Sequence, residues 1–208
     1  GRSEQARAAT LSHTASLAGS QAGADSLLMR LDIGQVASLP EFIETLKLLH
    51  VTGPLKSNRI ASMSCSGGEA ALIADIATDA GVSFPPLAPS QKQRLGKILG
   101  PLVKLANPLD YHTFIWNDPA KMAETFAAML HDDLGLGVVI ADFPREDRCD
   151  PSDWQCIIAA VQRVRNITGT PMAIAASLPE NLPESIARQL IDANIAPLCG
   201  LSEALTAM

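Results

Sequence analysis

The sequence predicts an α/β protein in which a doubly wound parallel sheet is covered by helices on both faces. From residue 59 onward, short apolar segments alternate with segments whose apolar residues recur at helical spacing. The apolar segments are continuous, as is typical of parallel strands that are buried on both faces. Because right-handed crossovers connect such strands, we expect a three-layer, flavodoxin-like domain over residues 54–208.

Composition and charge restrict the class of protein. Of the 208 residues, 47% are hydrophobic and 18% charged, which favours a packed core. The net charge of −6 argues against nucleic-acid or anionic-membrane binding, and no apolar run reaches the ~18 residues of a membrane helix. We therefore expect a soluble, cytoplasmic protein. Neither the four cysteines, which lack Cys-x-x-Cys spacing, nor the four scattered histidines indicate a metal site or a disulfide framework.

The region before the sheet, residues 1–53, is expected to hold short elements and a longer helix at its end. Residues 1–22 are rich in Ser, Ala and Gly and predict one short helical patch at most, followed by a polar loop around His13. A short helix is expected over 23–33, and a brief strand-like stretch closes at Val36. The next helix is expected to end at Gly53, which a proline follows.

Strands and helix starts follow from local signals. Two predicted N-caps, Ser38 and Ser90, are followed three residues later by Glu or Gln, which is the capping-box pattern. The predicted helix N-caps are Ser38, Ser90, Asp118, Asp150 and Ser202. The expected strands are 59–63, 82–87, 105–111, 136–142, 171–176 and 196–199.

The turn after the first strand is the first candidate site, since ligands of such sheets bind beyond the carboxyl ends of the strands. It reads Ser64-Cys65-Ser66-Gly67-Gly68-Glu69. The glycines allow close backbone approach and the next helix offers free N–H groups, so an anion site is one interpretation. A tight strand-to-helix turn without a ligand is the other. No Lys or Arg follows, so the turn is not a P-loop, and it lacks the acidic pair of a response regulator.

Nucleophilic chemistry is an alternative at the same turn. Cys65 or Ser66 could be activated by the helix N-terminus as in a hydrolase. Ser64 stands where a nucleophile elbow requires glycine, and no His-plus-acid pair is obviously placed to assist. A small packing residue is the simpler interpretation of Cys65.

Two histidines are further candidates. His13 lies among small polar residues, where a core role is hard to explain; it could attack a phosphoryl group or be a solvated loop residue. His112 follows a predicted strand and is more simply explained as structural. The charged run 145–148 is expected to be a solvated loop.

Several of these segments together resemble a known family, the NDP-forming acyl-CoA synthetases, which are relatives of succinyl-CoA synthetase. The resemblance runs through nearly all 208 residues. It is carried by Gly1-Arg2-Ser3-Glu4, Ser12-His13-Thr14-Ala15-Ser16-Leu17-Ala18-Gly19, Asn58-Arg59-Ile60-Ala61, Ser66-Gly67-Gly68, Ala74-Asp75 and Asn107-Pro108-Leu109-Asp110.

The resemblance implies an enzyme that joins a carboxylic acid to CoA with ATP and Mg, releasing ADP and phosphate through an acyl phosphate and a phosphohistidine. His13 matches the phosphorylated residue, and Ser66, Gly67 and Gly68 match a phosphate-holding helix start. Relatives also use a glutamate near the phosphohistidine, a role that we do not assign to Glu69. The resemblance also implies partner CoA-binding and ATP-grasp domains or subunits and a homo-oligomer.

By the same resemblance, residues 1–53 are the C-terminal part of a preceding CoA-ligase domain with the phosphohistidine loop, and 54–208 are the flavodoxin-like domain. We expect the chain alone to be an incomplete, inactive part of the enzyme that binds none of the cofactors tightly. A non-catalytic binding or assembly module with the same fold is the alternative.

Overall fold

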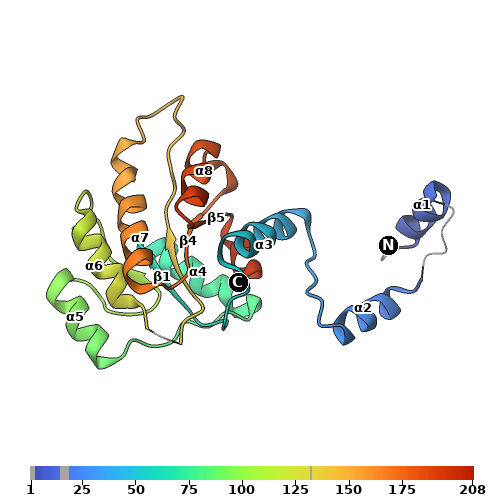
Figure 1. Ribbon diagram of the computed structural model, residues 1–208, viewed down its shortest axis with the longest axis horizontal. Helices are drawn as coiled ribbons and strands as arrows, with labels where there is room; N and C mark the ends of the chain where they lie inside the picture. Colours follow the sequence, from blue (N-terminus) through green and yellow to red (C-terminus); the bar gives the residue numbers. More distant parts are fainter. Residues whose placement is uncertain (1–2, 15–18, 132) are drawn as a thin grey trace. The chain divides into compact units, whose positions relative to one another are not determined.

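The computed structural model describes residues 3–14, 19–131 and 133–208, which form two compact units, Gly1–Ala37 and Ser38–Met208 (Figure 1). Each unit is described by itself. None of the described helices is long and apolar enough to cross a bilayer.

The N-terminal unit contains two helices, α1 (Glu4–Thr14) and α2 (Gln21–Arg30). The expected loop around His13 is wrong, because the backbone of His13 lies within α1. This helix starts with a run of strong helix formers (Gln, Ala and Arg) that compensates for the later Ser and Thr. The side chain of His13 lies outside the described part of the chain. No strand ends at Val36, where the chain runs irregularly to the next helix.

The second unit is built on five parallel strands in the order β2-β1-β3-β4-β5, which confirms the predicted fold class and the flavodoxin-like strand order. The strands are β1 (Ile60–Ser64), β2 (Leu109–Asp110), β3 (Leu136–Ile140), β4 (Met172–Ala176) and β5 (Ala196–Cys199). The strand expected over 82–87 is absent, and only an isolated bridge joins Ser83 to Arg59. The same segment contains Pro85 and Pro86, which have no N–H to donate to a ladder.

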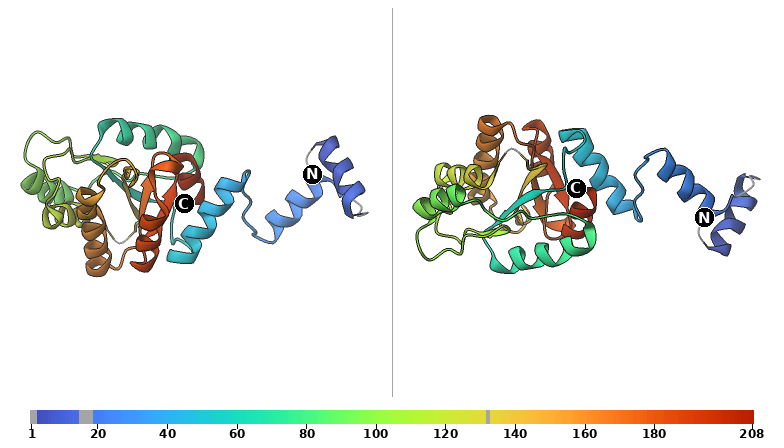
Figure 2. Two further views of the ribbon diagram at one scale, coloured as in Figure 1. Left: turned by 90° about the horizontal axis from the view of Figure 1, so that it is seen from above. Right: turned by 90° about the horizontal axis from the view of Figure 1, so that it is seen from below.

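Helices cover both faces of the sheet, and Figure 2 shows α4 on one side and α7 on the other. Alternate strand residues face opposite layers: Ala61 and Met63 belong to one core cluster and Ile60 to the other. One cluster includes residues of α5 (Pro89–Leu99), α6 (Pro119–Met129), α7 (Gln155–Thr168) and α8 (Glu184–Asp192). The other includes residues of α3 (Leu39–Thr52), α4 (Gly67–Ala80) and α9 (Leu201–Ala207).

Two of the predicted helix starts are confirmed. Ser38 and Glu41 form the capping box of α3: the Glu41 N–H donates to Ser38 Oγ at 3.2 Å and the Ser38 N–H donates to Glu41 Oε2 at 3.0 Å. Asp118 caps α6 by accepting the Lys121 N–H at 3.0 Å. As predicted, α3 ends at Gly53, whose φ of 68° suits glycine.

The other three predicted helix starts are displaced. α5 begins at Pro89 rather than after Ser90, because proline favours the first helical position. Its N-cap is Ala88, whose N–H donates to Gln91 Oε1 at 2.9 Å. Asp150 Oδ1 accepts the Ser152 N–H at 2.9 Å, but the N-cap of the 3₁₀ helix (Ser152–Trp154) before α7 is Pro151. α9 begins after Gly200 rather than at Ser202. A second 3₁₀ helix, Pro179–Asn181, precedes α8.

A buried carboxylate attaches α3 to the end of β5. Glu44 is only 5% exposed, and its Oε2 lies 2.6 Å from Lys47 Nζ and accepts the Cys199 N–H at 2.9 Å. α3 therefore packs as part of the sheet unit, which begins at Ser38. The domain boundary expected between residues 53 and 54 stays a prediction.

Candidate functional site

The turn singled out in the sequence joins β1 to the start of α4. Ser66 is the N-cap of α4, and its Oγ accepts the Glu69 N–H at 3.4 Å. Ser64 Oγ donates to the Ser66 carbonyl oxygen at 2.9 Å, and this hydrogen bond ties the turn to the end of β1. Gly67 and Gly68 are exposed. The start of α4 therefore presents backbone N–H groups and the positive end of the helix dipole to solvent.

The strand order places this turn at the position where ligands bind in flavodoxin-like sheets. β2 and β3 lie on either side of β1, so the chain leaves the sheet in opposite directions at this point. Asp110 ends β2 and Asp142 follows β3 by two residues. A Cβ at Gly67 would lie 3.2 Å from Asp110 Oδ2, so glycine allows the turn and this carboxylate to approach closely.

Three carboxyl groups lie around the turn, and two of them, Asp110 and Asp142, raise the pKa of the third, Glu69. The pKa of Glu69 is raised to about 7 by burial first, then by Asp142 and Asp110. Glu69 Oε2 is buried without a hydrogen-bond partner, and the favourable helix dipole at this first-turn position does not offset its desolvation. Near neutral pH Glu69 is therefore about half protonated and can donate a hydrogen bond.

The other two carboxylates hold the surrounding loops. Asp142 accepts the Ser177 N–H at 2.7 Å and also the Ser177 hydroxyl, which joins the ends of β3 and β4. Asp110 Oδ1 accepts the His112 N–H at 2.9 Å, and its Oδ2 lies 3.7 Å from His112 Nε2. His112 has a left-handed φ of 58° and stacks on Phe114 with a centroid distance of 5.2 Å. The sequence candidate His112 is thus brought beside the turn.

A cavity of about 320 Å³ opens between the start of α4 and the loops around β2. Lys104 and His112 line it together with Gly67, so an ammonium and an imidazole border the same cavity as the helix start, and the Asp110 carboxylate borders it too. This arrangement suits an anion that carries a phosphoryl or carboxylate group. The cavity is lined by Gly67, Ala70, Ala71, Lys104, Ala106, Pro108, Asp110 and His112.

The electrostatics of the turn disfavour a thiolate nucleophile. Burial raises the pKa of the Cys65 thiol, and the charges of Glu69, Asp110 and Asp142 raise it further. An activated cysteine requires the opposite environment. Packing remains the simpler role of Cys65, whose side chain lies against the main core cluster.

The charged run 145–148 is exposed, as the sequence predicted. Asp147 pairs with Arg145 at 2.6 Å and with Arg148 at 3.5 Å. The pKa of Asp147 is lowered, chiefly by its hydrogen bond from Arg145. Such exposed pairs contribute little to stability.

Sequence reasoning found the turn but missed the groups around it. Asp142 and Lys104 were not singled out, although an Asp directly after the clearest strand was a usable signal. The sequence shows Glu69 in the turn but does not indicate that its pKa is raised. Among the residues that the structure describes, no group of three or more His, Cys, Asp or Glu side chains could hold a metal ion.

Comparison with known proteins gives sequence similarity to one curated relative. The chain is 29% identical over 110 residues to the acetate–CoA ligase (ADP-forming) of Methanocaldococcus jannaschii. The match covers 53% of this chain and 16% of the ligase. No protein-family model matches the chain.

Solved structures with the same fold include an acid–CoA ligase. The dinucleotide-forming acetyl-coenzyme A synthetase 1 of Ca. Korarchaeum cryptofilum, in complex with phosphate and ADP, matches all of this chain and 44% of its own chain, with a TM-score of 0.78 and 21% identity. Its apo form gives a TM-score of 0.75 and 20% identity over the same shares. A Pyrococcus horikoshii protein matches 92% of this chain and 43% of its own, with a TM-score of 0.72 and 19% identity. The chain thus spans less than half of the relatives it matches and is similar to ADP-forming acyl-CoA synthetases.

Proposed function

We propose that this chain, as a relative of the ADP-forming acyl-CoA synthetases, is part of an enzyme that makes acyl-CoA from a carboxylic acid, CoA and ATP and releases ADP and phosphate. The observation that carries the proposal is the exposed start of α4 at the switch point of the sheet. Lys104 and His112 line the cavity of about 320 Å³ that opens beside it, which has room for a phosphoryl group. An anion that arrives there meets helix N–H groups and the Lys104 ammonium.

His13 is the proposed phosphoryl carrier. A neutral imidazole nitrogen of His13 attacks the γ-phosphorus of ATP, the P–O bond to ADP breaks, and ADP leaves. A carboxylate oxygen of the acid then attacks the same phosphorus, and the P–N bond to His13 breaks to give the acyl phosphate. The CoA thiol attacks the acyl carbon, the C–O bond to the phosphate breaks, and phosphate leaves as acyl-CoA forms. Backbone N–H groups of the 66–68 turn would hold the phosphoryl oxygens during the transfer. Glu69, when protonated, adds a hydrogen-bond donor to the same place and removes a charge that would repel the phosphate.

The cofactors are assigned to other parts of the enzyme. ATP supplies the phosphoryl group and CoA the thiol that accepts the acyl group. As the resemblance to the acyl-CoA synthetases implies, we place Mg and the nucleotide at the ATP-grasp part of the enzyme, outside this chain. The predicted partners are therefore CoA-binding and ATP-grasp domains or subunits.

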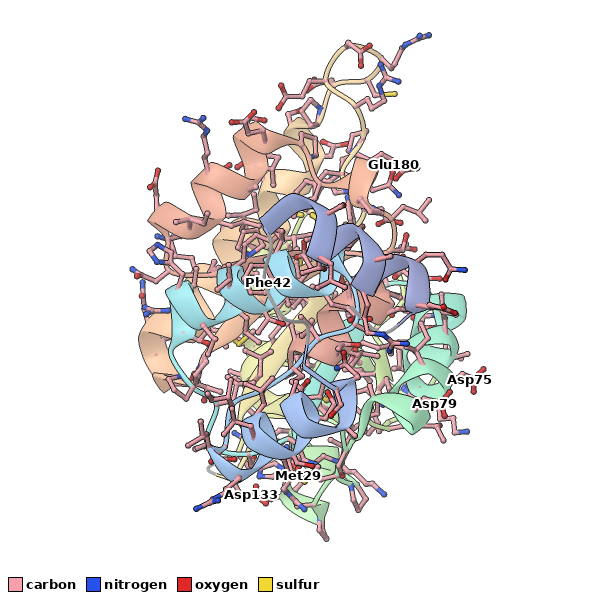
Figure 3. The ribbon with its side chains drawn as sticks, turned by 90° about the vertical axis from the view of Figure 1, so that its right-hand side faces the viewer. Met29, Phe42, Asp75, Asp79, Asp133 and Glu180 are labelled. Atoms are coloured by element: carbon pink, nitrogen blue, oxygen red, sulfur yellow. The ribbon has the colours of Figure 1, made fainter. Side chains whose placement is uncertain are left out.

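An apolar stripe on α3 supports a role in assembly with such partners. Its five large side chains recur at helical spacing and are exposed, Phe42 among them by 47%. Figure 3 labels Phe42 on this helix. The opposite face of α3 is attached to β5 through Glu44. We call Leu39, Phe42, Ile43, Leu46 and Leu49 the outer stripe. The same stripe is what a purely structural assembly module would use, and the labelling experiment below separates the two functions.

The test is phosphoryl labelling of the protein as expressed from its own gene, with γ-labelled ATP and Mg. Wild-type protein should acquire an acid-labile, base-stable label, and His13→Asn should lose it. His50→Asn is the matched control, since His50 is exposed on α3 and should keep the label. A label that persists in His13→Asn, or no label in folded wild-type protein that binds ATP, would refute the proposed carrier.

A further inference from the structure

An amine and a thiol from distant parts of the chain meet beside β5. Lys47 Nζ lies 3.5 Å from Cys199 Sγ, although the two residues are 152 positions apart in the sequence. Lys47 projects from α3, and Cys199 is the last residue of β5. The Lys47 side chain is 24% exposed and Cys199 is half-buried, so a small solute can reach the pair.

One carboxylate oxygen fixes both partners of this pair. Glu44 Oε2 is 2.6 Å from Lys47 Nζ and accepts the Cys199 N–H at 2.9 Å. A free lysine side chain samples many rotamers, and its ordering normally costs about 1.5–2 kcal/mol. In the folded chain the ion pair with Glu44 already orders the Lys47 side chain, so its amine lies next to the sulfur before any reaction.

From this geometry we infer that Lys47 and Cys199 form an oxidation-dependent covalent link. A peroxide first oxidises the thiol: a sulfur–oxygen bond forms, the peroxide oxygen–oxygen bond breaks, and water leaves if the peroxide is hydrogen peroxide. The Lys47 amine then attacks the sulfur of the sulfenic acid, the nitrogen–sulfur bond forms, and the hydroxyl leaves as a second water. The protein loses two hydrogen atoms, and a thiol reductant restores both side chains.

Glu44 has a chemical part in the second step as well as a positioning part. The amine attacks only after it has lost its extra proton, and Glu44 Oε2 is the nearest acceptor. Burial raises the pKa of the Cys199 thiol, which Lys47 partly offsets, so the first step speeds up as the pH rises.

The other three cysteines provide comparators within the same molecule. Cys149 is exposed, Cys65 is surrounded by carboxyl groups, and Cys156 Sγ lies 3.0 Å from the carbonyl oxygen of Asp153. None of them has a lysine amine within hydrogen-bond distance in the described structure. Peroxide should oxidise the exposed ones without forming a nitrogen–sulfur link.

The test treats the native chain with hydrogen peroxide, digests it, and identifies linked peptides by mass spectrometry. We expect a reducible peptide pair joining Lys47 to Cys199, lighter by two hydrogens than the sum of its parts and at least tenfold more abundant than any other lysine–cysteine pair. Lys47→Arg keeps the charge beside Glu44 but removes the attacking amine, so the pair should disappear. Oxidation in urea should also abolish it, because the link requires the folded geometry.

The opposite outcomes are equally clear. If Cys199 accumulates as sulfinic or sulfonic acid in the native chain without any linked peptide, the inference is wrong. It is also wrong if Cys199 couples to several lysines equally, or if the linked fraction is the same in urea. Circular dichroism of Lys47→Arg before oxidation shows whether that variant is folded, and the comparison of native with unfolded wild type needs no variant.

Discussion

Replacing Glu69 with Gln should stabilise the protein, and increasingly so as the pH rises. The pKa of Glu69 is raised in the folded chain from an ordinary value of 4.5 to about 7, by burial first and then by Asp142 and Asp110. A raised carboxyl pKa means that the folded state binds the proton more tightly than the unfolded state does. The stability that this group contributes is therefore present below about pH 4.5 and is lost as the pH rises through 7. Glutamine is neutral throughout and escapes that loss.

The size of the effect follows from the pKa and the exposure. A rise of this size would correspond to about 3 kcal/mol for a fully shielded group. Because Glu69 is only half-buried, solvent screening reduces this to about 1 kcal/mol. Urea unfolding of wild type and Glu69→Gln at pH 5 and pH 8 measures the difference. Glu124→Gln is the matched control on the exposed side of α6 and should leave the pH dependence unchanged. If Glu69→Gln and Glu124→Gln show the same pH dependence, the electrostatic account of the site is wrong.

Other substitutions test close packing and hydrogen bonds in the sheet unit. Gly67→Ala places a Cβ 3.2 Å from the carboxylate that ends β2, so phosphoryl labelling should fall several-fold, whereas Gly68→Ala meets only an ordinary 3.5 Å contact and should retain more label. Asn107→Ala removes side-chain hydrogen bonds of 3.0 and 2.9 Å to β1 and of 3.1 Å to the loop before α5, and should lower the free energy of unfolding by about 2–3 kcal/mol in urea titrations. Gly135→Ala drives a Cβ into the Ser57 carbonyl. The expected loss of about 1 kcal/mol or more in the free energy of unfolding should lower the thermal midpoint by several degrees. A midpoint within about 2 °C of wild type would contradict this.

The central strands could be predicted because their signal is local and strong. β3 and β4 lie in continuous apolar runs, and parallel strands buried on both faces require such runs. β2 is only two residues long, so the expected strand over 105–111 shrinks to its last part. The helix around His13 was missed because composition suggested a loop, whereas Gln, Ala and Arg at its start favour a helix.

The site was predictable only in part, for a physical reason. The turn with Gly67 is one contiguous segment, and its position after a strand indicates its place at the sheet edge. The charges that decide its chemistry come from other strands: Asp142 lies far along the chain, and only the parallel pairing of β1 with β3 brings it near Glu69. The same holds for Glu44 and Cys199, whose contact depends on how α3 packs on β5.

The outer stripe of α3 has a consequence for how the protein behaves as a colloid. At neutral pH the net charge of −6 keeps copies apart, but salt screens this repulsion within about 10 Å at 0.1 M. Sulfate also favours the burial of apolar surface. Screening of the repulsion and stronger apolar burial both favour association of copies. Ammonium sulfate should therefore drive copies together through this helix. Dilute buffers well above the isoelectric point near 5.1 should keep them dispersed.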